Sequence, residues 1–214
     1  MERVILFDMD GVLMNTEVLH YTIWQQVFAE RGLTIDFERY KGCIGSTNAR
    51  LMELIYEGYG MDFRSDESVI ERFSQLNWEH IRLHGVPPIE GVAQTLAQLK
   101  AMGFRMAVAS SSPLESIKLC LQSLQIQHFF DVLFSSEQVA KPKPAPDVFL
   151  AAAEKMGARP EDCVVVEDST NGTRAAKAAG MRCIGFDNPD SPGQCLDAAD
   201  TRIHRFCELL DVLK

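Results

Sequence analysis

Acidic residues follow two short apolar runs of this sequence, at the point where each run ends. Asp8 and Asp10 come directly after Val4–Phe7, and Glu167 and Asp168 come after three consecutive valines. A carboxylate can attack phosphorus as a nucleophile, and a second acid nearby can protonate the leaving oxygen and then activate water. Carboxylate oxygens are also ligands that Mg²⁺ prefers. The pairs therefore indicate phosphoryl transfer at a magnesium site, although either pair alone could equally begin a turn or cap a helix.

Two further groups along the chain would complete such a site. Lys143 lies between prolines in the segment 141–146, which favours a preorganised positive charge beside a nucleophilic carboxylate. Ser110 ends a third apolar run, and its hydroxyl can donate a hydrogen bond to a phosphoryl oxygen. Taken singly, such a lysine is typical of a solvated loop, and Ser110 with Ser111 is typical of a turn into a helix. Because ligands of open α/β sheets bind at the carboxyl ends of the strands, the four groups together predict one site.

Short apolar runs alternate with longer helical patterns over most of the chain. The runs are nearly continuous, as in strands that are buried on both faces of a parallel sheet. The predicted strands are Val4–Phe7, Met106–Ala109, Val132–Phe134, Val164–Val166 and Cys183–Phe186. The predicted helices are Val92–Met102, Leu114–Leu124, Asp147–Met156 and Asn171–Ala179. This alternation predicts an α/β fold with a doubly wound, Rossmann-like parallel sheet.

The segment 16–83 departs from this alternation, because its pattern is almost wholly helical. Apolar residues such as Leu19 and Ile23 recur there at helical spacing, as on one face of an amphipathic helix. We therefore expect a small helical cap domain, inserted after the first strand and lying over the carboxyl end of the sheet. The core domain then consists of residues 1–15 and 84–214.

The composition restricts the partners of the protein without naming one. The 214 residues carry a formal net charge of −9 and are 46% hydrophobic, which is ordinary for a globular protein. No basic cluster is present to bind nucleic acid or an anionic membrane surface. No stretch approaches the roughly 20 apolar residues of a membrane span, and the six cysteines form no zinc motif or C-x-x-C pair. We expect a cytoplasmic monomer that binds a small phosphorylated metabolite, with no nucleic-acid or membrane partner.

The sequence resembles the haloacid dehalogenase superfamily over nearly its whole length. Within that superfamily, it is similar to β-phosphoglucomutase and the related sugar-phosphate phosphatases. The segments that carry the resemblance are Phe7-Asp-Met-Asp-Gly-Val-Leu13, Ala109-Ser-Ser-Ser-Pro113, Lys143-Pro-Ala-Pro-Asp147 and Val166-Glu-Asp-Ser-Thr-Asn-Gly172. In this order, the four segments together are highly specific for the superfamily.

The resemblance implies a role for each of these groups. Asp8 is the expected nucleophile and Asp10 the expected acid and base. Mg²⁺ is expected to bind Asp8, the backbone carbonyl of Asp10 and Asp168, with Glu167 as a further ligand or as a partner of those ligands. The expected phosphate-binding residues of the core are Ser110, Ser111 and Lys143.

The choice between a phosphatase and a mutase depends on the cap. The resemblance to the mutase includes His20, which in that enzyme helps to position the acid. The mutase cap also carries an arginine for the second phosphate of its substrate, and here Asn48 occupies that position while Arg50 would face elsewhere on a helix. This difference favours a phosphatase, with a β-phosphoglucomutase-type mutase as the alternative. We expect Glu17, His20, Thr47 and Asn48 to contact the substrate.

Three other functions are to be compared with the sequence: dehalogenation, phosphonate hydrolysis and non-catalytic binding. The dehalogenases of the superfamily need no acid two residues after the nucleophile, and Asp10 is present here. Phosphonate hydrolysis uses a Schiff-base lysine in the cap, where Lys41 is the one lysine and has a context that resembles the mutase. A catalytically silent binding or regulatory module is the alternative from another class, and it would have no need of the complete set of charged residues.

Overall fold

The core of the protein is a six-stranded, wholly parallel sheet. The computed structural model describes residues 4–43 and 48–214. The strands lie in the order β3-β2-β1-β4-β5-β6, so that the direction of winding reverses between β1 and β4. Their bounds are β1 Val4–Phe7, β2 Arg105–Ser110, β3 Val132–Ser135, β4 Cys163–Glu167, β5 Arg182–Phe186 and β6 Thr201–Ile203. The doubly wound parallel sheet predicted from the sequence is confirmed, with β6 as a strand that the sequence pattern did not predict.

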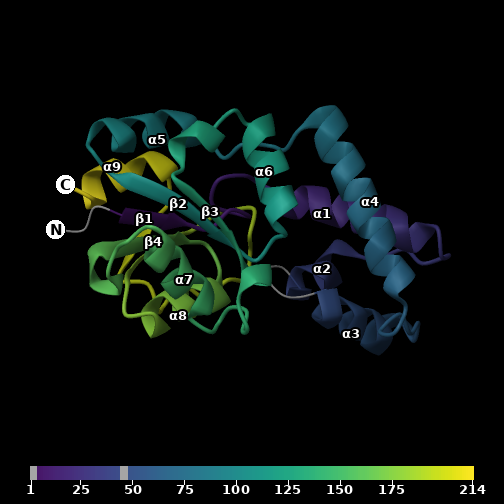
Figure 1. Cartoon of the computed structure of the whole chain (residues 1–214). Coiled ribbons are helices and arrows are strands. Elements are labelled where there is room, and N and C mark those ends of the chain that lie inside the picture. The colour runs from purple at the N-terminus through teal and green to yellow at the C-terminus, as the bar shows by residue number, and fades with distance from the viewer. Residues whose placement is uncertain (1–3, 44–47) are drawn as a thin grey trace.

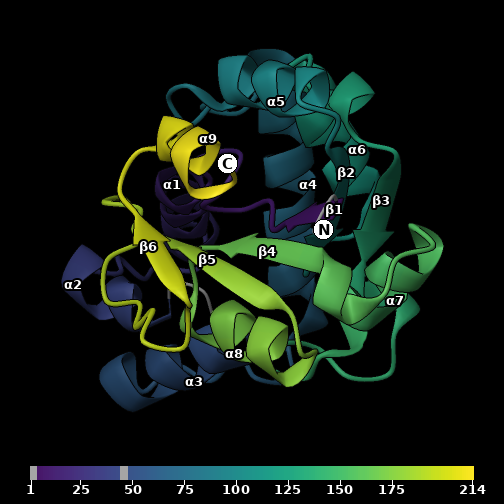
Figure 2. The same ribbon diagram turned by 90° about the vertical axis from the view of Figure 1, so that its left-hand side faces the viewer.

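Helices cover both faces of this sheet (Figures 1 and 2). One face carries α5 (Val92–Ala101), α6 (Leu114–Ser123) and α9 (Leu209–Val212), and the other carries α7 (Asp147–Lys155) and α8 (Thr170–Ala178). Residues along β1 alternate between the two layers: Ile5 and Phe7 belong to one apolar cluster, and Val4 and Leu6 belong to the other. Because β1 is buried on both faces, its sequence is continuously apolar rather than alternating.

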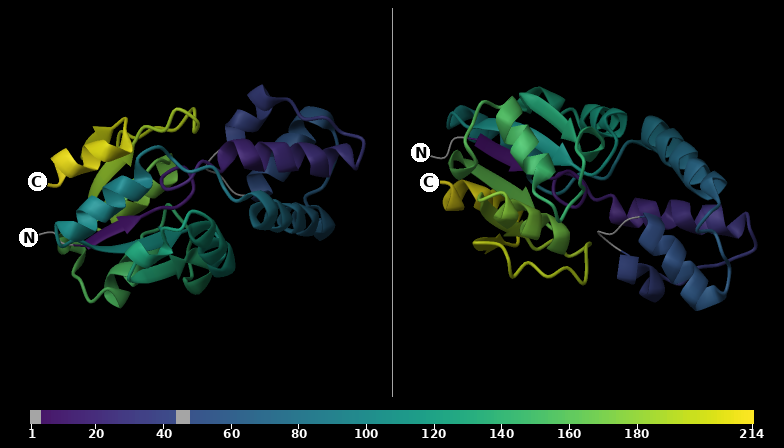
Figure 3. Two further views of the ribbon diagram at one scale, coloured as in Figure 1. Left: turned by 90° about the horizontal axis from the view of Figure 1, so that it is seen from above. Right: turned by 60° about the horizontal axis from the view of Figure 1, so that its bottom comes forward.

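A group of helices is inserted between β1 and α5, and it lies beyond the carboxyl ends of the strands (Figures 1 and 3). These helices are α1 Glu17–Ala29, α2 Phe37–Tyr40, α3 Asn48–Tyr59 and α4 Glu67–His84. The five short 3₁₀ helices among the described residues are η1 Lys41–Cys43, η2 Gln127–Phe129, η3 Ser136–Gln138, η4 Pro160–Asp162 and η5 Phe206–Glu208. The described part of the segment 16–83 contains no strand, as the sequence pattern predicts. The division of the chain into two domains at residues 15 and 84 stays a prediction.

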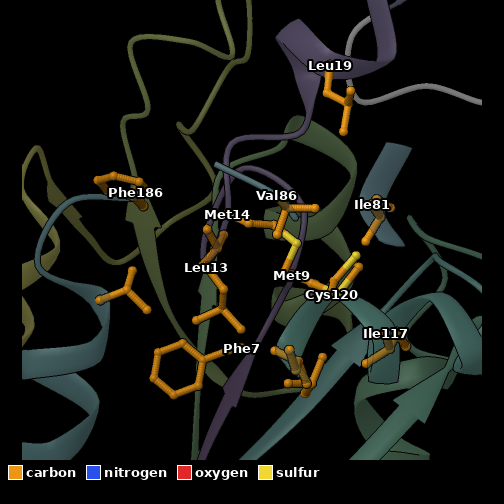
Figure 4. Packing of buried hydrophobic residues seen from close by; sticks show 14 of the residues in the cluster. Phe7, Met9, Leu13, Met14, Leu19, Ile81, Val86, Ile117, Cys120 and Phe186 are labelled. Carbon is orange, nitrogen blue, oxygen red and sulfur yellow. The ribbon is translucent and has the colours of Figure 1, made fainter. Parts of the chain in front are cut away.

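The two connections between the inserted helices and the sheet run side by side. Met14 forms an antiparallel bridge with Pro88, and the backbone N–H of Asn15 donates to the carbonyl oxygen of Pro87 at 2.8 Å. Figure 4 shows Met14 and Val86 next to each other within the buried apolar cluster. Because the outgoing connection begins a few residues after β1, the inserted helices are attached directly beside the end of that strand.

The described residues contain no helix that combines the length and the apolar character needed to span a membrane. The six cysteines are free thiols. Four are buried, namely Cys43, Cys120, Cys163 and Cys183, while Cys195 and Cys207 are exposed. The buried four behave as small apolar core residues, as the sequence indicated.

Leu6 provides a test of how strongly the central strand stabilises the fold. Its side chain is fully buried, between helices α7 and α8 and the sheet. Leu6→Ala would leave a cavity in a layer that cannot collapse freely, so we expect the free energy of unfolding to fall by about 2–5 kcal/mol. Chemical denaturation measures this change. The matched control is Leu83→Ala on α4, where the leucine is 69% exposed and the expected change is about 0.5 kcal/mol or less. Equal effects of the two substitutions would contradict the assignment of Leu6 to the core.

Candidate active site

Three carboxylates meet where β1 and β4 end. Phe7 and Val166 are partners in the parallel ladder, and the N–H of Asp8 donates to the carbonyl oxygen of Val166 at 3.0 Å. The residues that follow these two positions are therefore brought together. Asp8, Glu167 and Asp168 each offer a carboxylate oxygen, and these three oxygens lie within 4.8 Å of one another. All three residues are buried.

Lys143 places a positive charge against this cluster. It comes from the loop between β3 and α7, and its side chain is only 6% exposed. The ammonium group donates a short hydrogen bond to Oδ1 of Asp8, and it donates to Oε1 of Glu167 at 2.7 Å. A third hydrogen bond, to the carbonyl oxygen of Ala109 at 3.2 Å, ties the lysine to the end of β2. The ammonium group thus has a partner for each of its three protons, which fixes its position.

The cluster holds more negative charge than Lys143 neutralises. Burial raises the pKa of Asp8 to about 7, with Lys143 opposing the shift and Glu167 and Asp10 adding to it. Burial also raises the pKa of Asp168 well above its ordinary value, and the charges of Glu167 and Asp8 raise it further. For Lys143, burial lowers the pKa, but the charges of Asp8 and Glu167 outweigh burial and raise it above the ordinary value. A second cation would relieve this imbalance.

The donor atoms at this position fit magnesium. The cluster offers hard carboxylate oxygens, which are the protein ligands that Mg²⁺ takes alongside water. Close packing also holds the carboxylates in place, because a Cβ atom added to Gly11 would lie 2.0 Å from Oδ2 of Asp168. A Cβ atom added to Gly172 would lie 1.7 Å from Oε1 of Glu167. Only glycine therefore fits at either position, and each glycine lets a carboxylate approach the backbone.

Asp10 lies beside the cluster and is held by two hydroxyl groups. The hydroxyl of Thr16 donates to Oδ1 of Asp10, and the hydroxyl of Ser112 donates to Oδ2, each at 2.8 Å. Both oxygens are therefore occupied by groups from different segments, one before α1 and one after β2. Ser112 lies in the motif 109–113 and Thr16 lies outside every motif, and neither was predicted to hold Asp10. Hydroxyl residues are too common before helices for either one to stand out.

The predicted phosphate-binding serines differ in position. Ser110 is fully buried, and its Oγ accepts a hydrogen bond from the N–H of Ser112 at 3.0 Å. Ser111 and Ser112 line the cavity described below. The carbonyl of Ser112 is in turn held by the hydroxyl of Ser135, at 2.7 Å. These hydrogen bonds fix the shape of the loop after β2. Ser110 is buried beneath the loop and accepts its hydrogen bond, whereas Ser111 and Ser112 line the cavity.

A cavity of about 470 Å³ opens between the inserted helices and the sheet. The cluster carboxylates, Asp10 and Lys143 line one side of it. From the inserted helices, Glu17, His20 and Asn48 line the other side, and their contact with a substrate stays a prediction. Thr47 lies outside the described residues. Asn171, which belongs to the motif 166–172, and Gln194 also line the cavity, and no role was predicted for either residue.

His20 lines this cavity and lies close enough to Asp10 for the two groups to interact electrostatically. Burial lowers the pKa of its imidazole, and the charge of Asp10 opposes the shift. Its ring packs edge-on against Phe73 of α4, with 5.5 Å between the ring centroids. Phe73 itself stacks on Trp24 at 4.2 Å, so the position of His20 depends on packing between α1 and α4.

A comparison with protein families matches most of the chain. The family model described as haloacid dehalogenase-like hydrolase matches residues 5–186. Fructose-1-phosphate phosphatase YqaB of Escherichia coli is 33% identical over 182 residues, which cover 84% of this chain and 94% of that protein. The phosphorylated carbohydrates phosphatase of Thermotoga maritima is 30% identical, and the match covers 99% of this chain and 98% of that protein.

A solved structure resembles the fold over nearly the whole chain. The crystal structure of CbbY from Rhodobacter sphaeroides in complex with phosphate superposes with a TM-score of 0.85 at 29% identity. The match covers 98% of this chain and 96% of that chain. Both the sheet and the inserted helices therefore have counterparts in that protein.

The raised pKa values of Asp8 and Asp168 predict how pH affects the metal-free protein. Asp8 shifts from 3.8 to about 7, so between roughly pH 4 and pH 7 the folded protein binds protons that the unfolded chain has released. Stability from Asp8 is present at low pH and lost as pH rises through about 7, and the raised pKa of Asp168 acts in the same direction. Mg²⁺ binds the deprotonated carboxylates and replaces the protons. Thermal unfolding should show that Mg²⁺ raises the Tm more at pH 8 than at pH 5.

Asp168→Asn serves as the control for this experiment, because its neutral amide removes one titrating group from the cluster. Its metal-free Tm should fall less between pH 5 and pH 8 than that of the unaltered protein. An equal rise of Tm with Mg²⁺ at both pH values would show that the carboxylates do not exchange protons for the metal.

Proposed function

The chain belongs to the haloacid dehalogenase-like hydrolase family, and on that basis we propose that it is a magnesium-dependent phosphatase that hydrolyses a sugar phosphate or a similar small phosphorylated metabolite. The named activities of its relatives make it a phosphoric monoester hydrolase. The observation that carries the proposal is the buried cluster of Asp8, Glu167 and Asp168 around Lys143, at the floor of a cavity.

Asp8 is the proposed nucleophile. An oxygen of its carboxylate attacks phosphorus, the bond from phosphorus to the alcohol oxygen breaks, and an aspartyl-phosphate forms. The ammonium group of Lys143, already bonded to Oδ1 of Asp8, reduces the repulsion between this carboxylate and the incoming phosphate. In the resting site, the same contact holds the nucleophile in one orientation.

Asp10 is the proposed acid and base. It donates a proton to the leaving oxygen in the first step, and it accepts a proton from the water that attacks the aspartyl-phosphate in the second. The second step regenerates the carboxylate of Asp8 and releases inorganic phosphate. Since Ser112 and Thr16 occupy both oxygens of Asp10, the acid must exchange one of these hydroxyls for the leaving oxygen.

Asp8, the backbone carbonyl of Asp10 and Asp168 are the proposed ligands of Mg²⁺, with Glu167 as a further ligand or as their partner. When bound, the metal supplies positive charge that offsets the negative charge of the phosphate and of the cluster. Glu167 accepts hydrogen bonds from Lys143 and, through Oε2, from the N–H and hydroxyl of Ser169 at 2.9 Å. These contacts favour a supporting role for Glu167.

The charges of the cavity support a substrate with one phosphate. Among the described residues that line it, Lys143 is the one with a permanent positive charge. Asn48 lines the cavity, whereas Arg50 is half exposed and pairs with Glu57 at 3.5 Å. A phosphosugar mutase must hold a bisphosphate at both ends, and this cavity offers no second fixed cation within the described residues. The electrostatic interaction of His20 with Asp10 in this cavity is the observation that favours the mutase as second candidate.

Lys41 does not support phosphonate hydrolysis. Its ammonium group donates to Glu38 at 2.7 Å and lies over the ring of Phe37. A Schiff-base lysine has to reach the substrate, and Lys41 is not among the described residues that line the cavity. The complete set of charged groups around Asp8 also disfavours a catalytically silent module.

Asp8→Asn tests the nucleophile. An amide cannot form the aspartyl-phosphate, so we expect Mg²⁺-dependent phosphate release from p-nitrophenyl phosphate and from fructose 1-phosphate to fall by at least about 10³-fold. Release of inorganic phosphate is the measurement. Asp211→Asn, on the exposed surface at the C-terminal helix, is the matched control and should retain full activity. Undiminished turnover by Asp8→Asn would refute the assignment.

A product analysis separates the phosphatase from the mutase. The protein is incubated with β-glucose 1-phosphate and a trace of the 1,6-bisphosphate in the presence of Mg²⁺. We expect inorganic phosphate to accumulate without glucose 6-phosphate, because the described residues that line the cavity include no fixed cation for a second phosphate. Glucose 6-phosphate formed without free phosphate would make the mutase the correct function.

A further inference from the structure

The row of residues at positions 69, 73, 77 and 81 of helix α4 is apolar except for Asn77. Val69 and Ile81 are buried in the apolar cluster, and Phe73 packs against it (Figure 4 labels Ile81). Asn77 stands four residues after Phe73 and four before Ile81, so it lies on the same face of the helix. Asparagine favours a helix less than leucine does, and leucine would continue the apolar row. Packing and helix propensity therefore do not explain the residue at this position.

The side-chain oxygen of Asn77 is buried and accepts no hydrogen bond. Among the described residues, four buried side-chain atoms lack a partner, in Asn15, Asn77, Thr95 and Gln127. Of these residues, Asn77 is the one that lines the cavity beside the carboxylate cluster. A buried oxygen without a donor costs free energy that a suitable ligand would recover. Because the torsion that turns an asparagine amide has broad energy wells, this oxygen can turn towards a ligand in the cavity.

Asn77 belongs to the wall of the cavity that would meet the alcohol part of a phosphoester. The proposed mechanism places the phosphate beside Asp8 and Lys143, at the ends of the strands. The inserted helices lie beyond those ends (Figure 3), so the alcohol has to extend towards them. The described residues of this wall include polar, uncharged side chains and aromatic rings, namely Asn48, Ser74, Asn77, Trp24, Phe73 and Trp78. Glu17 adds a carboxylate to the same wall.

We propose that Asn77 is a specificity-determining residue whose amide binds a hydroxyl group of the substrate's alcohol, so that the substrate is the monophosphate of a sugar or another polyol. The inference rests on the proposed function and identifies the part of the substrate that helix α4 recognises. A hydroxyl donates and accepts hydrogen bonds, as an amide does, and it supplies the donor that Oδ1 lacks. A carboxylate in place of the hydroxyl could only accept, and it would add negative charge to a wall that already carries Glu17.

Asn77→Leu tests this contact, because leucine has the same branched arrangement of heavy atoms and no polar group. With Mg²⁺ present, kcat/KM is measured on fructose 1-phosphate and sorbitol 6-phosphate, and on p-nitrophenyl phosphate, whose leaving group carries no further hydroxyl. We expect kcat/KM to fall about 5- to 100-fold for the two polyol phosphates, because their hydroxyl loses its partner. With p-nitrophenyl phosphate it should change by less than about twofold. Asn77→Ala, which cannot obstruct the cavity, should show the same selectivity.

Gln75→Leu is the matched control on the same helix. Gln75 is exposed, its Oε1 accepts from Arg72 at 3.0 Å, and it is not among the residues that line the cavity. Its kcat/KM should equal that of the unaltered protein for every substrate. Thermal unfolding gives a second measurement: Asn77→Leu should keep or raise the Tm, because it removes a buried oxygen without a partner. A structural role for Asn77 would instead lower the Tm and reduce the turnover of all three substrates alike.

The outcomes separate this inference from the proposed function. If the unaltered protein hydrolyses the phosphoesters but Asn77→Leu changes kcat/KM equally for all of them, or for none, the inference is wrong and the function stands. If the unaltered protein hydrolyses 2-phosphoglycolate, which carries a carboxylate, at least as well as the polyol phosphates, the inference is likewise overturned while the phosphatase stands. Absence of Mg²⁺-dependent turnover on every substrate would refute both.

Discussion

Three buried carboxylates share one buried ammonium group, and this imbalance of charge governs the site. Asp8, Glu167 and Asp168 meet within 4.8 Å, and Lys143 pairs directly with two of them. Charges removed from water interact strongly and are costly unless neutralised. The protein resolves the conflict partly by raised pKa values at Asp8 and Asp168. A divalent cation would resolve it fully, which explains why a metal belongs to the proposed function.

The parallel sheet makes this concentration of charge possible. Because β1 and β4 are adjacent and in register, the first residues after them are forced together, and the apolar strands beneath are too well packed to let them separate. The helices that flank the sheet hold the strands from both sides (Figure 2). Lys143 lies in the loop after β3, and β2 separates β3 from β1 in the sheet. It completes the site although 135 residues separate it from Asp8 in the sequence.

The acid is connected to the inserted helices rather than to the cluster. Thr16 stands at the N-cap position of α1, yet its side chain makes no capping hydrogen bond. Its hydroxyl donates to Asp10 instead, so α1 gives up a contact that is typically worth about 1 kcal/mol. Thr16 also lies two residues after Met14, which forms a bridge with Pro88 where the inserted helices join the core. Any movement of the inserted helices would therefore move the Thr16 hydroxyl that binds Asp10.

The sequence by itself determined the sheet and the principal charged residues. Continuous apolar runs identify buried parallel strands, and acids placed immediately after them must lie at one edge, so Asp8, Asp168 and Lys143 could be selected from pattern and resemblance. The strand Thr201–Ile203 was missed because three residues with an exposed arginine give no apolar run. Tertiary structure alone decided that Ser110 is buried beneath its loop and that Thr16 and Ser112 hold Asp10. These contacts join side chains whose types are common and whose partners are distant in the chain, and only packing brings them within a hydrogen bond of each other.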